Sequence, residues 1–333
     1  MRVDFHTHST ASDGTLTPAA LAAAGARAGL VAMALTDHDN CDGLEVFQSQ
    51  VSAHVSCLAS HVLEGEGKDE RRETRDVRGG GGRETGDVRR GWVGHETGDM
   101  RRVAGIELSI EAGPDFDKFH LLGLGIDPTY PALKEFLKKV LEGRNARNAR
   151  IIENFNRLGF GMGDEIFGYA NGDVLARPHF ARWLVERGHA ATVAEAFDRY
   201  LLPNSPKETR CYEERYHPPQ SESFGLIHAA GGLCVLAHPK YGRKEWRETG
   251  PDYAIAERAL AALKEKGLDG VEAFYQANTV DENIAFTRIA DRLGLLKTAG
   301  SDFHGANKPT VTLGMEVSEA FIAPFMERVG CRG

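Results

Sequence analysis

The sequence contains several short motifs of histidine, aspartate and glutamate, each of which ends or closely follows a short apolar run. In His6-Thr7-His8 both imidazoles lie on one face of an extended chain, because the side chains of a strand alternate between its two faces. Two imidazoles on one face can bind one metal ion, and carboxylates from other strand ends can complete the ligand set and bridge to further ions. The other residues of this kind are Asp13, His38, Glu107, His120, His238, Asp302 and His304.

A single histidine is usually a surface residue or a hydrogen-bonded residue of the core. Here the histidines and carboxylates recur at the end of one apolar run after another. Strand ends are where an α/β barrel collects its reactive side chains. The recurrence therefore favours a metal site over independent structural histidines.

Apolar runs typical of strands alternate with helical segments along the chain. Strands are predicted at 3–5, 31–35, 103–108, 120–125, 233–237, 270–274 and 296–299, and helices at 17–28, from 42 onward, at 252–266 and at 281–293. Repeated strand–helix units with buried strands predict a parallel sheet. Because the polar motifs fall at the carboxyl ends of the strands, we favour a closed α/β barrel over an open doubly wound sheet.

The bulk composition limits the function classes. The chain has 333 residues, of which 41% are hydrophobic, and this allows one large domain with an insert. A net charge of −8 argues against a large basic surface that binds nucleic acid, although a locally basic pocket is compatible with it. The five cysteines are odd in number and form no Cys-x-x-Cys pair, so a reducing cytoplasm is the simplest location. We expect no signal peptide, no membrane span and no obligate protein partner.

Two segments interrupt the strand–helix pattern. The first, 64–102, contains an imperfect repeat of the type Arg-Glu-Thr-Gly-Asp-Val-Arg, with frequent glycine and few apolar residues. Such a low-complexity segment cannot bury a core, and we expect it to be a disordered, functionally neutral insertion. An RNA-contacting arm is the alternative, which the balancing acidic residues disfavour.

The second segment, 131–219, is predicted to be a small helical subdomain inserted between barrel strands, with helices at 132–158, 174–187 and 192–202. The barrel would then consist of residues 1–130 and 220–333. Arginines on helices are usually solvated, but Arg177 stands beside Pro178 and His179 at a helix start. From there Arg177 could close over an anionic substrate as a bidentate clamp.

In these motifs the chain resembles the PHP (polymerase and histidinol phosphatase) family of metal-dependent phosphoesterases. The residues that carry the resemblance, which covers 1–47 and about 103–310, are His6-Thr-His8, Ser12-Asp13-Gly14, Thr36-Asp-His38-Asp39, Gly105-Ile-Glu107, His120, His238-Pro239 and Ser301-Asp302-Phe-His304. The resemblance implies a distorted (β/α)7 barrel with a trinuclear metal centre, usually of manganese and sometimes of zinc or iron. The helical insert resembles the branch of 3′,5′-nucleoside bisphosphate phosphatases and exonucleases that trim RNA from its 5′ end.

The resemblance also implies three ligand sets. They are His6, His8, Glu107 and Asp302 for one ion, Asp13, His38 and His304 for a second, and a bridging Glu107 with His120 and His238 for a third. Mixed imidazole and carboxylate ligands suit Mn²⁺, Zn²⁺ or Fe²⁺ better than Mg²⁺ or Ca²⁺. The predicted catalytic residues are Asp13, His38, Glu107 and His304. Asp37 and Asp39 are expected to hydrogen-bond the imidazoles and orient them.

The predicted substrate contacts are Arg144, Arg177, His179 and Lys240. The chain departs from the branch in 203–211, where relatives have a Lys-Pro-rich stretch, and at Lys240-Tyr241, where the branch tends to have Arg-Tyr. Both departures touch substrate contacts rather than metal ligands, so they bear on the choice of substrate more than on the chemistry.

The predicted reaction is metal-assisted phosphoester hydrolysis, with a hydroxide bridging two ions as the nucleophile. The favoured substrate is the 3′-phosphate of a nucleoside 3′,5′-bisphosphate. The alternatives are a 5′-to-3′ exonuclease on short RNA, a histidinol-phosphate phosphatase, and a metal-binding regulatory protein without turnover. No Gly-x-Ser-x-Gly elbow and no Gly-x-x-x-x-Gly-Lys-Ser/Thr loop is present, which disfavours a serine nucleophile and a P-loop enzyme.

Overall fold

A computed structural model of the chain describes residues 1–50, 100–111, 113, 116, 119–170 and 174–330. Its strands are β1 (Arg2–Asp4), β2 (Ala32–Leu35), β3 (Arg101–Ile110), β4 (Phe119–Leu124), β5 (Leu233–Leu236), β6 (Gly270–Tyr275), β7 (Leu296–Gly300) and β8 (Met315–Glu316). Its helices are α1 (Pro18–Arg27), α2 (Leu44–Ser49), α3 (Pro131–Arg157), α4 (Arg177–Glu186), α5 (Val193–Ala196), α6 (Gln220–Ala229), α7 (Trp246–Thr249), α8 (Tyr253–Glu265), α9 (Val280–Leu293) and α10 (Glu319–Gly330).

The strands form one eight-stranded sheet in the order β7-β6-β5-β4-β3-β2-β1-β8. Beyond its last residue, β1 also meets β7. Phe5 N–H donates to Ala299 O at 2.9 Å, Asp302 N–H donates to His6 O at 2.9 Å, and Thr7 pairs in parallel with Phe303. The small β8 pairs antiparallel with the first residues of β1. Strands β1–β7 therefore close on themselves, and the predicted distorted (β/α)7 barrel is confirmed.

The prediction of a parallel sheet is wrong at one strand. β4 runs antiparallel to both β3 and β5, while the pairs β1–β2, β2–β3, β5–β6 and β6–β7 are parallel. Only residues 111–118 separate β3 from β4, and this is too short for a crossover helix, so the chain returns beside β3 in the opposite direction. The first residues of β4 consequently lie at the same end of the barrel as the last residues of β3.

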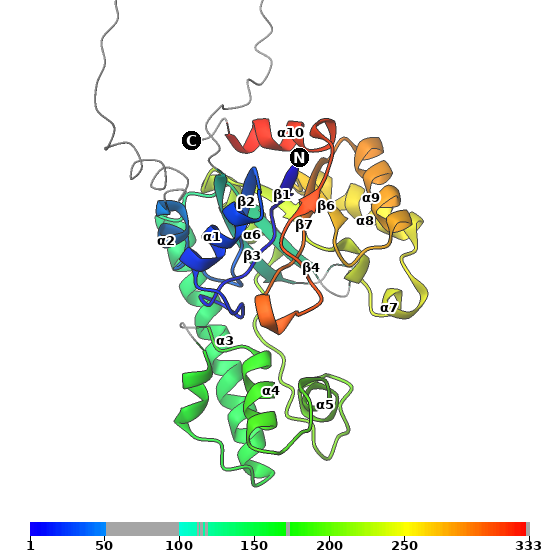
Figure 1. Cartoon of the computed structure of the whole chain (residues 1–333). Coiled ribbons are helices and arrows are strands. Elements are labelled where there is room, and N and C mark those ends of the chain that lie inside the picture. Colours follow the sequence, from blue (N-terminus) through cyan, green and yellow to red (C-terminus); the bar gives the residue numbers. More distant parts are fainter. Residues whose placement is uncertain (51–99, 112, 114–115, 117–118, 171–173, 331–333) are drawn as a thin grey trace, which may run out of the picture. The chain divides into compact units, whose positions relative to one another are not determined.

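Two apolar clusters show how the strands are packed. Ala32 and Ala34 belong to a cluster inside the barrel, and Met33 and Leu35 belong to the cluster between the strands and the surrounding helices. This alternation is the period of two that a strand imposes. Figure 1 shows α1 and α2 beside one part of the sheet, α8 and α9 beside another, and α10 across the end where β1 begins. There Phe325 of α10 meets Phe5 edge to face at 4.8 Å between ring centroids.

Most helix starts follow the expected local chemistry. Thr17 caps α1 by accepting the Ala20 N–H, and Pro18 opens the first turn, as the sequence predicts. Thr279 and Glu282 form a capping box at the start of α9. The sequence analysis placed no element at α6, whose amphipathic pattern is weak, at α7 and β8, which are very short, or at α10, which contains Pro324.

The helix α3 joins the helical insert to the barrel. Its first half places Leu133, Phe136 and Val140 in the cluster around the barrel, and its second half places Ile151 and Phe155 in a separate cluster with α4. Figure 1 shows α3 leading from the strands to α4 and α5. One continuous helix thus links the two cores, and side chains in its middle turns lie between them.

Three predicted boundaries need correction. α4 begins at Arg177 rather than at 174, because Pro178 fits only the first helical turn and Ala176 is extended. The helix predicted at 192–202 is α5 followed by a π-helical turn at Phe197–Leu201. β3 begins at Arg101, so the last residues assigned to the low-complexity insertion belong to the sheet. Positions 64–99 of that insertion lie outside the described residues. Among the described helices, none combines the length and apolar character that a membrane crossing requires.

The closure of the barrel depends on one buried carboxylate, and this gives a first prediction. Asp4 accepts hydrogen bonds from Ser301 N–H (3.0 Å), Ser301 Oγ (2.6 Å) and Gly314 N–H (2.8 Å), and so links β1 to the segments after β7 and before β8. Asp4→Ala leaves these donors unpaired and should lower the free energy of unfolding by about 3 kcal/mol or more. Asp4 also accepts the His6 N–H at 3.3 Å. Ser301→Ala removes one of these four bonds and should cost about 1 kcal/mol. Urea unfolding in the presence of EDTA measures both, and equal losses would contradict this role of Asp4.

Candidate metal centre and active site

The predicted ligands gather at one end of the barrel. His6 and His8 follow β1, His38 follows β2, and Glu107 lies on β3. His238 follows β5 and the pair Asp302 and His304 follows β7, while Asp13 lies in the turn after His8. His120 is near the start of β4, and the reversed direction of that strand brings it to the same end.

The centre of this cluster is the carboxylate of Glu107, which is 1% exposed. Its Oε2 lies 3.2 Å from His6 Nε2, 3.2 Å from His8 Nε2 and 3.0 Å from His38 Nδ1. Its Oε1 lies 2.7 Å from His120 Nδ1 and 3.1 Å from His238 Nε2. Imidazoles from four different strand ends therefore converge on one acidic group.

At this end of the barrel, three groups of side chains have the geometry of a metal site, with ligand atoms within 4.8 Å of one another. They are His6, His8, Glu107 and Asp302; His8, Asp13, His38 and His304; and Glu107, His120 and His238. The structure brings together all nine predicted ligands in the three predicted sets, and it adds His8 to the set of Asp13. Because Glu107 and His8 each belong to two groups, the groups adjoin one another.

The donor atoms of these groups fit metal ions. The atoms His6 Nε2, His8 Nδ1 and Nε2, His38 Nδ1 and Glu107 Oε2 are buried and have no hydrogen-bond partner. Buried polar atoms are normally hydrogen-bonded, and the exceptions in a native structure call for a bound group. Nitrogen and carboxylate donors in this arrangement match a transition metal better than Mg²⁺ or Ca²⁺.

The electrostatics of the cluster agree with cation binding. Burial opposes a charge on His8, but the close carboxylates of Asp302 and Glu107 outweigh it and raise the pKa of His8 to about 9. Burial dominates at His38 and lowers its pKa to about 3. Burial disfavours the charge of Glu107 as well, and the imidazoles of His38 and His6 nevertheless hold its pKa well below the usual value. Without ions, protons balance part of this negative charge, and a metal ion would displace them.

The backbone is strained at three strand ends that carry the site. Asp39 (φ 52°), His238 (φ 29°) and Asp302 (φ 59°) are the non-glycine residues with positive φ among the described residues. Such conformations cost of order 1–3 kcal/mol each and persist only where the surroundings impose them. All three follow barrel strands at the end where the ligands gather, so the strain is concentrated at the site.

The prediction that Asp37 and Asp39 orient imidazoles is wrong, since neither carboxylate hydrogen-bonds one. Asp37 accepts from Ser9 N–H (2.8 Å), Ser9 Oγ (2.6 Å) and Ser12 Oγ (2.6 Å), and so fixes the turn between His8 and Asp13. A carboxylate outside the predicted ligand sets that does contact an imidazole of the site is Glu272, whose Oε1 lies 3.0 Å from His6 Nδ1. Its only signal in the sequence is a charged residue inside an apolar strand.

Asp39 instead accepts from two guanidinium groups, those of Arg144 and Arg215, and from Ser109 N–H. Burial disfavours the charge of Asp39, but the two arginines hold its pKa well below the usual value. Arg144 comes from α3 and Arg215 from the segment that returns from the helical insert to the barrel. Asp39, the residue that follows His38, therefore holds both α3 and the returning segment of the insert at this strand end.

A cavity of about 620 Å³ lies beside the cluster. Asp13, His38 and His120 line it on the barrel side, and Arg144, Arg147, Arg177, Arg215, His217 and Lys244 supply basic groups to its other walls. Pro203, from the segment that departs from the branch, also lines it. Apart from the candidate metal ligands, Glu214 is the one carboxylate residue in this lining, so basic groups outnumber acidic ones there.

Arg147 is the most informative residue of this cavity. It is 3% exposed, its Nε is buried without a hydrogen-bond partner, and in the described part of the chain no carboxylate pairs with it. Burial, Arg144 and Arg215 lower its pKa, so its surroundings disfavour the charge that it carries. The sequence analysis missed Arg147 and Arg215. The spacing of three between Arg144 and Arg147, which places both on one face of α3, could have revealed the first.

The four predicted substrate contacts have different positions. Arg144 and Arg177 line the basic cavity. His179 is buried, and its Nδ1 accepts the Ala176 N–H at 3.0 Å at the start of α4. The ammonium of Lys240 donates to Glu282 Oε2 (2.7 Å) and to the carbonyl of Ala277, and Lys240 lines neither cavity of the site, so its role as a substrate contact stays a prediction.

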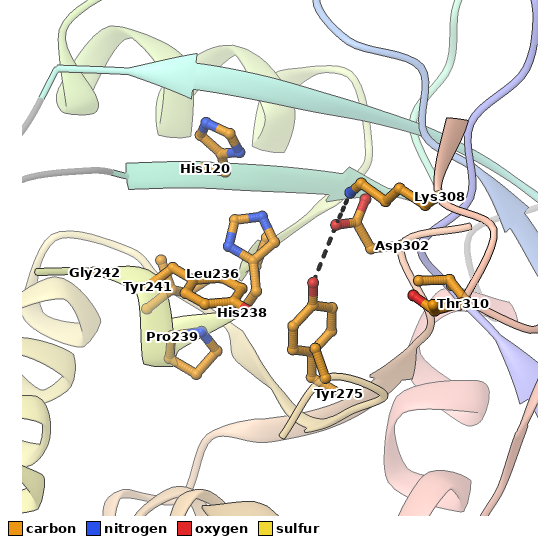
Figure 2. Close-up of a pocket in the computed structure, with 13 residues that line it drawn as sticks. His120, Leu236, His238, Pro239, Tyr241, Gly242, Tyr275, Asp302, Lys308 and Thr310 are labelled. Atoms are coloured by element: carbon orange, nitrogen blue, oxygen red, sulfur yellow. Dashed lines mark hydrogen bonds and ion pairs between the residues drawn. The ribbon is translucent and has the colours of Figure 1, made fainter. Parts of the chain in front are cut away.

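A second cavity, of about 420 Å³, adjoins the cluster through His120, His238 and Asp302. Figure 2 shows Tyr241 and Tyr275 near His238, with the Tyr275 hydroxyl and the Lys308 ammonium both directed at Asp302. The Tyr275 hydroxyl lies 3.1 Å from Asp302 Oδ2. This cavity is more aromatic than the basic one, and His120 lines both.

Other reactive groups in the described residues are already satisfied. His228, Cys234 and Asp269 lie close together, but Asp269 Oδ2 accepts from His228 Nε2 (2.7 Å) and Cys234 N–H (2.9 Å), and no buried side-chain atom of this group lacks a partner. Burial raises the pKa of the Cys41 and Cys211 thiols to about 12. These thiols stay protonated near neutral pH and are poor nucleophiles.

Comparisons with known proteins agree with this geometry. Residues 4–63 match the model of the PHP domain. The chain is 30% identical over 304 residues to a 3′,5′-nucleoside bisphosphate phosphatase of Chromobacterium violaceum, covering 91% of this chain and 87% of the relative. It is 28% identical to the 5′-3′ exoribonuclease Rnm of Salmonella typhimurium, with 90% and 84% covered. A solved structure from Chromobacterium violaceum, described as an amidohydrolase with bound sulfate and no metal, superposes with a TM-score of 0.72 at 25% identity, covering 99% of this chain and 96% of that one.

The arrangement around Glu107 gives a second prediction. After loading with Mn²⁺ the protein should hold more than one ion per chain by elemental analysis, and chelation should abolish its hydrolytic activity. Glu107→Gln should lower activity by about 100-fold or more, since even groups that only orient metal ligands contribute about 10- to 100-fold. Glu111→Gln, at the exposed end of the same segment, is the matched control. One ion per chain or fewer in the loaded wild type would rule out the trinuclear assignment.

The buried imidazole of His179 gives a third prediction, on pH. Burial lowers its pKa from 6.5 to about 4 in the folded protein. Between these values the unfolded chain binds more protons than the folded chain, so folding stability falls as pH falls from about 6.5 to about 4. His179→Asn keeps an acceptor for the Ala176 N–H but lacks this titration. The difference in unfolding free energy between wild type and variant should shift over that window by at most about 1.4 kcal/mol per pH unit. A difference that does not vary with pH would contradict the assignment.

Proposed function

This chain belongs to the PHP family of metal-dependent phosphoesterases, and we propose that it removes the 3′-phosphate from nucleoside 3′,5′-bisphosphates. Hydrolysis of phosphoesters with the help of bound metal follows from the family and from the ligand groups at the barrel end. The choice of a bisphosphate rests on a single observation, the buried guanidinium of Arg147, whose Nε has no hydrogen-bond partner and which pairs with no carboxylate among the described residues.

A buried cation without a partner is expensive. The effective penalty for removing an ion from water is several kcal/mol, and a protein retains such a group where a bound anion compensates it. Arg147 lines a cavity that Asp13 and His38, two candidate metal ligands, also line. A molecule with one phosphate at the metal centre and another a few ångströms away would neutralise Arg147. A nucleoside 3′,5′-bisphosphate has this form.

The surroundings of Arg147 support a phosphate rather than a carboxylate or a halide. Arg144 and Arg215 share the single carboxylate of Asp39, so this trio still carries a net positive charge. Their guanidinium groups are held in place before any substrate binds. Several planar guanidinium groups around one space suit an anion with three acceptor oxygens, because each group can donate two parallel hydrogen bonds.

We propose three Mn²⁺ ions for the three ligand groups, with Zn²⁺ or Fe²⁺ as alternatives. When bound, these ions would supply activated water near neutral pH and would neutralise the charge on the phosphate oxygens. The chain itself contributes binding and orientation. Arg147 and Arg177 hold the distal phosphate, and Asp39 fixes Arg144 in place. The location of the enzyme in the cytoplasm and the extent of the helical subdomain, 131–219, stay predictions.

A 5′-to-3′ exonuclease on short RNA is the second candidate, and the aromatic cavity favours it. An exonuclease must place the 5′-terminal phosphate on one side of the metal centre and the downstream nucleotide on the other. The basic cavity and the cavity of Tyr241 and Tyr275 both border His120, and bases stack on aromatic side chains. Histidinol phosphate has a single phosphate and leaves the charge of Arg147 uncompensated, so the basic cavity disfavours it.

A fourth prediction tests the distal phosphate site. Losing a charge-assisted contact to one phosphate should cost roughly 2–3 kcal/mol. Arg147→Met and Arg177→Ala should therefore each lower kcat/KM for adenosine 3′,5′-bisphosphate by roughly 30- to 150-fold. Each should affect a simple monophosphate ester far less, because that ester has no second phosphate to lose.

The control is Arg150→Ala. Arg150 lies on the same helix as Arg147, but it is half exposed, pairs with Glu213 and does not line the cavity. Its removal should leave both substrates unaffected. Equal losses on the bisphosphate and the monophosphate in Arg147→Met would remove the main support for a bisphosphate substrate. Measuring 5′-phosphorylated oligoribonucleotides and histidinol phosphate beside the bisphosphate would rank the candidate functions.

A further inference from the structure

Glu272 is a buried acidic residue that belongs to none of the candidate metal groups. It lies on β6, is 0% exposed, and within the described residues it has no lysine or arginine partner. A carboxylate without a cationic partner is costly in such a place unless hydrogen bonds satisfy its oxygens. The hydrogen bonds that the Glu272 carboxylate accepts therefore indicate its role.

One oxygen of Glu272 faces His6. Oε1 lies 3.0 Å from His6 Nδ1, and a carboxylate accepts hydrogen bonds, so the ring nitrogen that faces it is the one that carries the proton. His6 Nε2 is then left with its lone pair. That nitrogen points at Glu107 Oε2 (3.2 Å) and Asp302 Oδ1 (3.6 Å), where the first ligand group meets.

The other oxygen holds a ligand of a different group. Oε2 accepts the backbone N–H of His238 at 2.7 Å. His238 has a φ of 29°, a strained conformation that needs an external restraint. Its Nε2 lies 3.1 Å from Glu107 Oε1, on the opposite side of that carboxylate from His6. A single side chain thus fixes one imidazole of the first group and one of the third.

The fold provides space for this arrangement in two ways. The pairing of β6 with β7 shifts register between Glu272 and Phe274, and such an irregularity redirects a side chain locally. On the neighbouring β7, Gly300 lies beside the end of the Glu272 side chain, and a Cβ there would overlap Glu272 Oε1 and His6 Cβ. Both features allow a carboxylate to reach the ring of His6 inside a packed barrel.

We propose that Glu272 is a positioning residue that selects the metal-binding tautomer of His6 and at the same time fixes the His238 backbone, and so couples two of the three metal sites. The proposal rests on the metal centre of the proposed function. A partner that orients a metal-ligating histidine typically changes metal affinity by about 10- to 100-fold. Because Glu272 contacts ligands of two groups, its effect should extend to more than one ion.

Glu272→Gln is the test, since glutamine has the same shape but only one acceptor oxygen. If that oxygen keeps the His238 N–H, the amide NH₂ faces His6 Nδ1 and favours the tautomer whose Nε2 carries the proton. If the amide is reversed, two N–H donors oppose each other at His238. Isothermal titration of the metal-free chain with Mn²⁺ should show about 10- to 100-fold weaker binding at one or more sites. The ¹⁵N shifts of His6 or the line shape of His238 should change in the metal-free protein.

Glu282→Gln is the matched control. Glu282 is also buried and also accepts two hydrogen bonds, from Lys240 and from Thr279 N–H, but it contacts no candidate ligand. The control should bind Mn²⁺ as the wild type does. Metal-free Glu272→Gln should have a thermal midpoint no lower than that of the control, because a buried carboxylate has been replaced by a neutral amide.

The outcomes separate this proposal from the function on which it rests. Wild-type protein that binds neither Mn²⁺ nor Zn²⁺ would overturn the metal-dependent function itself. Wild-type protein that binds Mn²⁺ while Glu272→Gln binds it equally well, with unchanged His6 shifts, would overturn only the role of Glu272. A metal-free midpoint far below that of the control would assign Glu272 to barrel stability and would also overturn the proposal.

Discussion

The carboxylate of Glu107, buried among five imidazoles, is the constraint on which the rest of the site depends. A negative charge in the interior needs positive charge close by, and here protons on histidines or metal ions must provide it. The barrel meets this need because the carboxyl ends of its parallel strands lie together at one end, where Glu107 is. The reversed β4 does not break the rule, since His120 stands near its start. Strain at His238 and Asp302 is a consequence of bringing so many ligands to one carboxylate.

The basic cavity needs negative charge close to its guanidinium groups. Its arginines are held by the residue next to a candidate metal ligand. His38 faces Glu107, while the next residue, Asp39, holds Arg144 and Arg215. One strand end therefore supports the metal centre with one side chain and the guanidinium cluster with the next. Since Asp39 also binds both ends of the helical insert, the insert cannot shift without moving the arginines relative to the metal centre. The distance between the two sites is thus fixed by a buried ion-pair network rather than by flexible loops.

The sequence predicted what depends on local pattern and failed where distant residues meet. His6-Thr-His8 follows directly from strand alternation, and the other polar motifs follow from their places after apolar runs, so a barrel with a metal site at its strand ends could be foreseen. The division into three ligand sets came from the resemblance to the PHP family. Glu272 could not, because its role comes from a register shift and from the small size of Gly300 on another strand. Arg215 lies far along the chain from Asp39, and only the folded insert brings them together. Lys240 was predicted from its sequence neighbours, and the sequence did not indicate that its ammonium group donates to Glu282 of α9.

The metal centre has buried acceptors without partners, and the basic cavity has buried donors without partners. This difference argues for a substrate that contacts both the metal ions and the arginines. The metal centre leaves lone pairs of His6, His8 and Glu107 without partners, so it lacks cations. The basic cavity leaves N–H groups of Arg144 and Arg147 without partners, so it lacks an anion. Metal ions alone would satisfy the first and increase the positive charge beside the second. A substrate with two phosphates resolves both, because one phosphate can lie on the ions while the other accepts from the arginines. A molecule with a single phosphate would leave one set of buried groups uncompensated, and that difference in free energy is a physical basis for selecting the bisphosphate.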